Sequence, residues 1–333
     1  MNFVYTFDDN FVPQAAASIC SICENNKSEK NTFFVISFGI SDINKNELKA
    51  MVEKYGNFME FIEITNLNSY FDFNINTTGW KPIVLARLLI DKLLPKKIDR
   101  VIYIDGDTIV RNDITDFFHL DLKGKTLAMS IEPTISKQRT EALKMGNYPY
   151  CNAGVLLIDL NKWRKNDIGR KLIDFYKSNN GKLFAHDQDS INAYMKKEIK
   201  IVPPKYNYCN TFDQYSYKFI CKQMKPIDYS KYVSEKEYYE SRMNPSIIHY
   251  LGEERPWRKG NTHKYRNDYK KYLSMTVWSD TKDETGWGLY FFCWRIFNFI
   301  TKPFPGLRLF IINSLIPTFM KIRANKLKKE SKK

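Results

Sequence analysis

The chain has 333 residues, of which 43% are hydrophobic and 15% aromatic, so it carries enough apolar surface to fold around a real core. Its 14 glycines and 13 prolines exclude collagen-like and Pro-rich classes, and no fixed-period repeat indicates a solenoid or propeller. A compact enzyme or binding protein of one large or two ordinary domains remains.

The net charge is +15, and most of the excess lies at the C-terminal end. Residues 295–333 hold 10 basic residues and one acid, Glu330, whereas residues 1–294 hold 42 basic and 36 acidic residues. A basic surface attracts nucleic acid, anionic lipid or phosphorylated small molecules. The position of the charge along the chain must separate these partners.

The six cysteines lack the spacing of a small disulfide framework. Cys20 and Cys23 stand in an apolar stripe at helical spacing, which favours helix packing over a redox or metal motif. The first residues show no basic segment followed by an apolar one, so we expect no secretory signal. We therefore expect a cytoplasmic protein with reduced thiols.

Apolar strand patterns alternate with helical patterns along the first hundred residues. Strands are predicted over 2–6, 32–37 and 58–64, and helices from Pro13, over 44–54 and over 82–94. This alternation is typical of a doubly wound, mostly parallel α/β sheet. Ligands of such sheets bind at the carboxyl ends of the strands, so the loops that follow strands are the candidate sites.

The strongest candidate is a buried-strand pattern that begins at Arg100 and delivers Asp105, Gly106 and Asp107. Two carboxylates at the end of a buried strand need compensation, and a divalent cation such as Mg²⁺ or Mn²⁺ supplies it. Two alternatives stay open at this point. The acids can be ordinary strand-end turn residues, or Asp105 can be the nucleophile of a haloacid-dehalogenase-type phosphatase.

Three later segments also combine polar residues with strand or helix ends. Asn152 and Gly154 precede an apolar strand, where an amide can bind sugar hydroxyls and a small residue lets a ligand approach, although a simple turn is equally consistent. Asp187, Gln188 and Asp189 open a helix that is predicted to run to about residue 197, with Asp189 as its N-cap or as a sugar-facing group.

The last segment ends an apolar run at His249 and continues through Gly252 to Arg255, Pro256 and Trp257. The glycine permits a tight turn and the arginine can hold a phosphate in a bidentate manner. A histidine after an apolar run is by itself most often a packed core residue.

Taken together, these segments resemble glycosyltransferase family 8, the retaining galactosyl- and glucosyltransferases of bacterial lipopolysaccharide and capsule synthesis. The resemblance covers about residues 1–260 and rests on six short motifs in order. They are Asp8-Asp9-Asn10, Leu85-Ala86-Arg87-Leu88, Asp105-Gly106-Asp107, Asn152-Ala153-Gly154, Asp187-Gln188-Asp189 and the segment from His249 to Trp257.

The resemblance implies a GT-A fold and a UDP-sugar donor, UDP-galactose or UDP-glucose, whose diphosphate is bridged by Mn²⁺, with Mg²⁺ possible. It implies metal binding by Asp105, Asp107 and His249, and nucleotide binding by Thr6, Asp8, Asn10, Asp105, Gly106, Gly252 and Arg255. It places Arg87, Asn152, Ala153, Asp187 and Gln188 on the donor sugar, with Gln188 below the anomeric carbon. One departure is Arg255, where the family usually has lysine; both are cations that can stabilise a leaving diphosphate.

The chemistry of the leaving group indicates how transfer would proceed. Negative charge develops on UDP, so the metal and Arg255 are the expected electrostatic catalysts. Gln188 is a poor nucleophile, which favours front-face substitution, and Asp189 is the carboxylate to test for a covalent route. The phosphatase alternative lacks a second acidic metal loop after Asp107. A non-catalytic nucleotide-sugar-binding protein is the other alternative.

After Trp257 the composition changes, and residues 285–329 hold no acid. An aromatic helix is predicted over 287–300, and a second apolar stretch over 307–320 runs into a basic end. Such segments are typical of helices that lie on an anionic membrane surface, although a helical pair packed on the catalytic domain is the alternative. We expect a catalytic domain over 1–260 and a membrane-association region over 261–333, peripheral to the inner face of the cell membrane, with a lipid-linked saccharide acceptor and no nucleic-acid partner.

Overall fold

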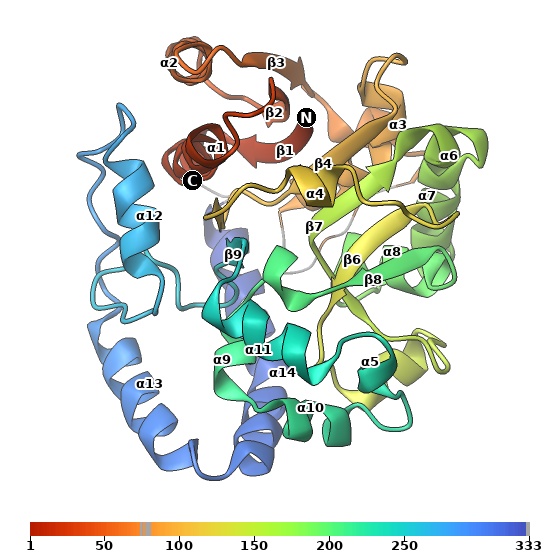
Figure 1. The fold of residues 1–333 in the computed structure, drawn as a ribbon, viewed down its shortest axis with the longest axis vertical. Helices are drawn as coiled ribbons and strands as arrows, with labels where there is room; N and C mark the ends of the chain where they lie inside the picture. Colours follow the sequence, from red (N-terminus) through yellow and green to blue (C-terminus); the bar gives the residue numbers. More distant parts are fainter. Residues whose placement is uncertain (74, 76, 78–80, 331–333) are drawn as a thin grey trace.

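A computed structural model describes residues 1–73, 75, 77 and 81–330, and for residues 326–330 it describes the backbone alone. Its centre is a seven-stranded sheet in the order β3-β2-β1-β4-β7-β6-β8 (Figure 1). The strands are β1 (Asn2–Asp8), β2 (Thr32–Phe38), β3 (Phe58–Glu63), β4 (Arg100–Ile104), β6 (Leu127–Ile131), β7 (Cys151–Asp159) and β8 (Ile199–Val202). A separate two-stranded sheet pairs β5 (Thr108–Val110) with β9 (Ile247–His249).

The sheet is mostly parallel, as predicted, with one reversal. Strands β3, β2, β1 and β4 run parallel to one another, as do β6 and β8, and β7 runs antiparallel to both β4 and β6. The inner parallel strands β1, β2 and β4 consist of nearly continuous buried apolar residues, which is what a sheet covered on both faces requires. Asp8 and Asp105 therefore leave the carboxyl ends of neighbouring strands at the same edge.

Helices cover both faces of this sheet. Figure 1 shows α1 (Val12–Asn25) and α2 (Asp42–Glu53) on one side and α6 (Leu160–Lys165), α7 (Ile168–Ser178) and α8 (His186–Met195) on the other. Helix α1 starts with a proline in its first turn and buries Cys20 and Cys23, so the predicted packing role of that pair is confirmed. Further short helical segments are α4 (Thr115–Phe118), α5 (Lys137–Ala142), α9 (Thr211–Gln214), α10 (Tyr217–Gln223) and α11 (Glu235–Met243), with single 3-10 turns at Asp9–Phe11, Leu67–Tyr70, Pro204–Tyr206 and Tyr229–Lys231.

Two local predictions were wrong. The segment predicted as one helix over 82–94 is a 3-10 helix, η3 (Pro82–Leu89), followed by one α-helical turn, α3 (Ile90–Leu93). Over eight residues, apolar spacing cannot separate three residues per turn from 3.6. Asp189 is not the N-cap of α8; Ala185 holds that position, and the Asp189 carboxylate accepts the Ala185 N–H from inside the helix.

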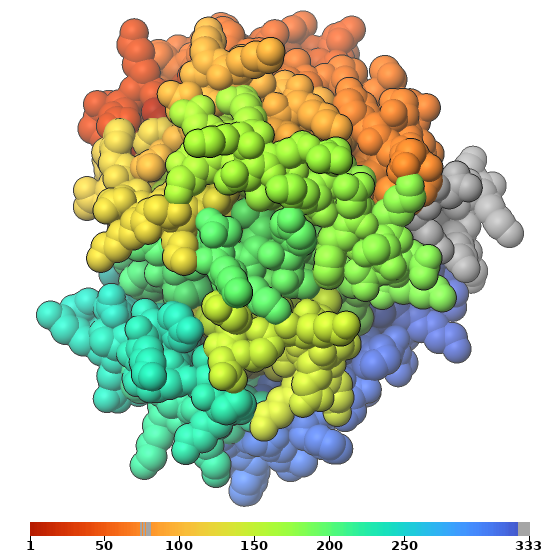
Figure 2. All heavy atoms as spheres, turned by 90° about the vertical axis from the view of Figure 1, so that its right-hand side faces the viewer, coloured from red at the N-terminus to blue at the C-terminus, as the bar shows by residue number. Residues whose placement is uncertain are grey.

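The C-terminal part folds onto both ends of the molecule. Helix α12 (Arg266–Leu273) packs against α1, where Asn25 Nδ2 donates to the Tyr272 hydroxyl at 2.7 Å. Beyond it, α13 (Gly288–Thr301) and α14 (Pro305–Glu330) form a hairpin that turns at the bottom of the molecule as drawn in Figure 1, and part of this segment appears in blue at the lower right of Figure 2. None of the helices among the described residues is both long and apolar enough to cross a membrane.

His263 gives this arrangement a measurable pH dependence. It is buried, its Nδ1 accepts the Tyr265 N–H at 3.2 Å, and burial lowers its pKa from 6.5 to about 4. Because the unfolded chain takes up a proton near pH 6.5 while the folded chain does so near 4, the folded state should lose about 3 kcal/mol between these values. In urea unfolding, the free energy of unfolding should fall by that much less in His263→Gln than in wild type when the pH is lowered from 7 to 4. An equal fall in both proteins would contradict this role of His263.

Candidate active site

The carboxyl ends of β1 and β4 open into a cavity of about 1480 Å³. Its lining includes most of the residues singled out from the sequence: Thr6, Asp8, Arg87, Asp105, Gly106, Asp107, Asn152, Gly154, Asp187, Gln188, Asp189, His249, Gly252 and Arg255. Asn10 is exposed and lies outside this lining, and Ala153 takes part through its backbone only. Asp8 forms an ion pair with Lys81, a lining residue that the sequence did not single out.

The small β5–β9 sheet brings the predicted metal ligands together. Thr108 pairs with His249 across it, and the Tyr250 N–H donates to the Asp107 carbonyl at 2.9 Å. His249 Nε2 lies 3.3 Å from Asp107 Oδ1 and 3.9 Å from Asp105 Oδ2. One ligand atom from each of the three residues lies within 4.8 Å of the others.

The charges of this triad fit a divalent cation. Burial raises the pKa of Asp105, an effect that Arg87 opposes and Asp107 adds to. Burial alone would also raise the pKa of Asp107, but His249 and Arg255 lower it to about 2; in return, Asp107 and Asp105 outweigh burial and raise the pKa of His249. Two oxygen ligands with one imidazole suit Mn²⁺ or Mg²⁺, and a divalent cation would match the charge of the two carboxylates.

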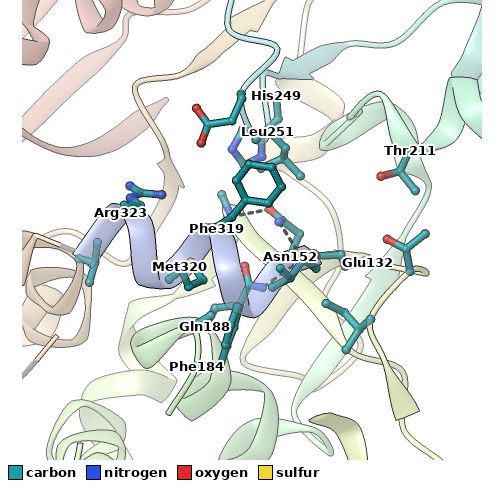
Figure 3. Close-up of a pocket in the computed structure, with 18 of the residues that line it drawn as sticks. Glu132, Asn152, Phe184, Gln188, Thr211, His249, Leu251, Phe319, Met320 and Arg323 are labelled. Atoms are coloured by element: carbon teal, nitrogen blue, oxygen red, sulfur yellow. Dashed lines mark hydrogen bonds between the residues drawn. The ribbon is translucent and has the colours of Figure 1, made fainter. Parts of the chain in front are cut away.

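A chain of side-chain hydrogen bonds fixes His249 from behind. Its Nδ1 is 2.9 Å from Asn207 Oδ1, and Asn207 Nδ2 donates to Asn152 Oδ1 at 2.9 Å. Asn152 Nδ2 in turn donates to Glu132 Oε2 at 3.0 Å (Figure 3). The contact with the asparagine orients the imidazole so that Nε2 faces the two aspartates.

Arg87 connects the metal end of the cavity to α8. Its Nη2 donates to Asp105 Oδ1 at 2.9 Å, and its Nε lies 2.7 Å from Asp187 Oδ2. The guanidinium also stacks on the Tyr103 ring. The side chain is buried, as is Asp187, whose pKa burial raises to about 6 against the opposing charge of Arg87. One guanidinium thus holds two carboxylates from different elements in a fixed relation.

Gln188 and Asp189 are held in different ways. Gln188 Oε1 accepts the Ala153 N–H at 2.8 Å, and its Nε2 donates to Glu132 Oε2 and the Tyr150 hydroxyl, each at 3.0 Å. Asp189 is 1% exposed; Oδ1 accepts from Arg139 and Tyr150, both at 2.6 Å, while Oδ2 accepts from Ala185. Both oxygens of Asp189 are therefore bonded inside the protein.

The phosphate-binding candidates lie beside the triad. Gly252 has a φ of +72°, which favours glycine, and its carbonyl accepts from Arg255 Nε at 3.1 Å. Arg255 Nη2 lies 3.3 Å from Asp107 Oδ2, and the guanidinium lies over the Trp257 ring. This cation is therefore placed next to the metal ligands and still lines the cavity.

Sequence reasoning missed several residues of this site. Glu132 follows the apolar strand β6 directly, the same signal that marked Asp105, but a lone acid after a strand drew no attention. Asn207 and Arg139 belong to no motif, and only the fold brings them to the cavity edge. From the far end of the chain, α14 contributes Met320 and Arg323 to the lining (Figure 3).

Gly154 is needed for the approach of His249. A Cβ at this position would lie 2.1 Å from His249 Cε1 and 2.6 Å from its Nδ1. Gly154→Ala should therefore displace the imidazole while leaving all three ligands in the chain, and we expect it to abolish the rise in melting temperature that saturating Mn²⁺ produces in wild type.

Gly288→Ala is the matched control, because nothing lies within 4 Å of a Cβ there and its backbone is helical. Its response to Mn²⁺ should equal that of wild type. An undiminished Mn²⁺ response in Gly154→Ala would show that His249 is not a ligand.

Comparisons with known proteins agree with this geometry. The family model of glycosyl transferase family 8 matches residues 2–261. General stress protein A of Bacillus subtilis is 30% identical over 285 residues, covering 84% of this chain and 95% of the relative. A lipopolysaccharide 1,2-glucosyltransferase of Escherichia coli K12 is 26% identical over 296 residues, covering 84% of this chain and 79% of the relative. The crystal structure of the galactosyltransferase LgtC, in complex with donor and acceptor sugar analogs, superposes with a TM-score of 0.69 at 23% identity, covering 86% of this chain and 99% of that one.

The fold is therefore GT-A, and the phosphatase and non-catalytic alternatives find no support. The chain belongs to glycosyl transferase family 8 and is a retaining hexosyltransferase.

Proposed function

We propose that the protein transfers galactose or glucose from a UDP-sugar to a saccharide acceptor of a cell-surface glycan, with Mn²⁺ as the cofactor. The observation that carries this proposal is the single cavity in which the Asp105, Asp107 and His249 triad lies between Arg255 and the Arg87–Asp187 pair. A divalent cation held by the triad would neutralise charge on the donor diphosphate.

The remaining roles follow from position. Arg255 binds the diphosphate and stabilises the negative charge that develops on UDP as the anomeric bond breaks. Thr6 and Asp8, at the end of β1, take the uridine side of the cavity, with Asn10 in the turn that follows. Arg87, Asn152 and Asp187 hold the donor sugar, and their fixed contacts orient it before reaction.

Retention of configuration is best served by front-face substitution in this cavity. Gln188 is an amide whose oxygen already accepts a backbone N–H, so it is a poor nucleophile. Asp189 uses both oxygens in hydrogen bonds and lies buried beneath Gln188, which supports a positioning role. The leaving phosphate then takes the proton of the acceptor hydroxyl. A glycosyl adduct trapped on Asp189 would overturn this route.

A test of the donor and the metal is the release of UDP from UDP-galactose and UDP-glucose, with Mn²⁺ or with EDTA. Wild type should release UDP from one of the two donors, and this release should require Mn²⁺. Asp107→Ala should lower the rate of release about 100-fold or more, because it removes a metal ligand. Asp116→Ala, at an exposed acid of α4, is the control and should behave as wild type. Equal release with EDTA would refute the metal-dependent mechanism.

We further propose that residues 261–333 hold the enzyme on the inner face of the membrane, next to a lipid-linked acceptor. Outside the cavity lining, α13 and α14 leave large apolar side chains exposed: Leu289, Phe292, Ile296, Phe299, Ile300, Leu307, Phe310 and Ile322. Exposed Lys302 and Lys321 lie among them. An apolar face with basic residues beside it suits an anionic lipid surface. The free state of all six cysteines is in keeping with the reducing side of that membrane.

Vesicle flotation tests the membrane proposal. Wild type should float with phosphatidylglycerol vesicles and not with neutral phosphatidylcholine. Phe299→Ser and Phe310→Ser, at side chains 84% and 69% exposed, should each weaken binding about 10-fold, since each removes a buried aromatic ring from the lipid interface. Met243→Ser, 85% exposed at the end of α11, is the control. Flotation that is unchanged in both phenylalanine variants would rule out this face.

A further inference from the structure

Helix α14 lies across the cavity rather than apart from it. Leu309, Ile316, Met320 and Arg323 line the same cavity as Asp107 and His249. Figure 3 shows Phe319, Met320 and Arg323 on one stretch of this helix, facing the region of His249, Asn152 and Gln188. Residues 60 or more positions beyond His249 thus form one wall of the cavity.

A buried arginine joins α14 to α13 inside the hairpin and lies within electrostatic reach of the catalytic part. Arg308, 4% exposed, lies over the rings of Trp294 and Phe297 at 5.3 and 5.1 Å, and its Nη1 donates to Thr301 Oγ1 at 3.0 Å. Its charge also acts on Glu254, which is the neighbour of Arg255 in sequence. The position of α14 is therefore tied to the turn that carries the phosphate-binding arginine.

The cavity keeps ample space with α14 in this position. Sites for small ligands have volumes of about 300 to 1,000 Å³, and this cavity measures about 1480 Å³. The helix therefore bounds the cavity without filling it. A cavity of this size can hold a nucleotide-sugar with α14 as one of its walls.

Arg323 lies at the metal end of the wall. Its side chain is partly buried, and its pKa is lowered by burial and by the charges of Arg255 and Arg258, while Glu253 and Asp107 act in the opposite sense. Arg258 already forms ion pairs with Glu253 and Glu284. Arg323 and Arg255 are thus two guanidinium groups within electrostatic reach of the same metal-ligand carboxylate. Guanidinium groups bind phosphate oxygens through paired N–H donors.

We propose that Arg323 is a second cationic ligand of the donor diphosphate, which makes α14 a functional wall of the active site. This inference rests on the proposed UDP-sugar donor. Arg323 and Arg255 would bind the diphosphate from two sides, and both would stabilise the charge that UDP gains as it leaves. The C-terminal helix then serves donor binding directly, in addition to any role at a lipid surface.

The test compares the affinities of UDP and uridine, in the presence of Mn²⁺, for the full-length protein by titration calorimetry. Arg323→Gln should weaken UDP binding about 10-fold or more, because a charge-assisted hydrogen bond is lost, and should leave uridine binding unchanged. Arg323→Lys should recover part of the UDP affinity. Lys321→Gln, which removes an exposed charge two residues away on the same helix, should bind UDP as wild type does.

The outcomes separate the inference from the function on which it rests. If wild type binds no UDP, the proposed donor is wrong. If wild type binds UDP and Arg323→Gln binds it equally well, Arg323 is not a phosphate ligand. If Arg323→Gln weakens UDP and uridine by the same factor, the residue only supports the wall, and the inference is likewise overturned.

Discussion

The structure depends on the pairing of three largely buried carboxylates with nearby cationic side chains. Asp105, Asp107 and Asp187 converge on one cavity, and burial of ionised carboxylates is costly unless opposite charge is close. Arg87 supplies that charge to Asp105 and Asp187, and its own pKa is raised by these carboxylates in spite of burial. Because η3 carries Arg87, β4 delivers Asp105 and α8 delivers Asp187, one buried guanidinium fixes three elements against one another.

A similar pairing of polar groups extends along the cavity from His249 to Gln188. Hydrogen bonds run from His249 through Asn207 and Asn152 to Glu132, whose Oε2 also accepts from Gln188. A displacement at either end would therefore disturb the other, since each amide has its donors and acceptors assigned by its neighbours. Rigid orientation of this kind is what electrostatic catalysis requires, because the groups must already face the charge that develops.

How much of the structure can be predicted from the sequence depends on how far apart in the chain the interacting residues lie. Continuous apolar runs mark buried strands, so β1, β2, β4 and the acids that follow β4 could be predicted. The family resemblance that rests on the six motifs then implied the triad, whose residues do lie together. The helix type over 82–89 could not be predicted, because a short segment contains too few turns to define its period. The cap of α8 could not be predicted either, because the Asp189 carboxylate is bonded to Arg139, which is fifty residues away in the sequence. Asn207 likewise has meaning only once β9 places His249 beside it.

The C-terminal hairpin shows why composition alone left two interpretations open. Its aromatic and basic residues predict a lipid-facing surface, and its outer side does leave Phe299 and Phe310 in contact with solvent. Its inner side buries Arg308 and lines the cavity with Met320 and Arg323, which is the packed alternative. The two-helix hairpin can do both, since its outer and inner sides contact different partners. Attachment to a surface through the outer face would then hold in place the very wall that the inner face presents to the donor.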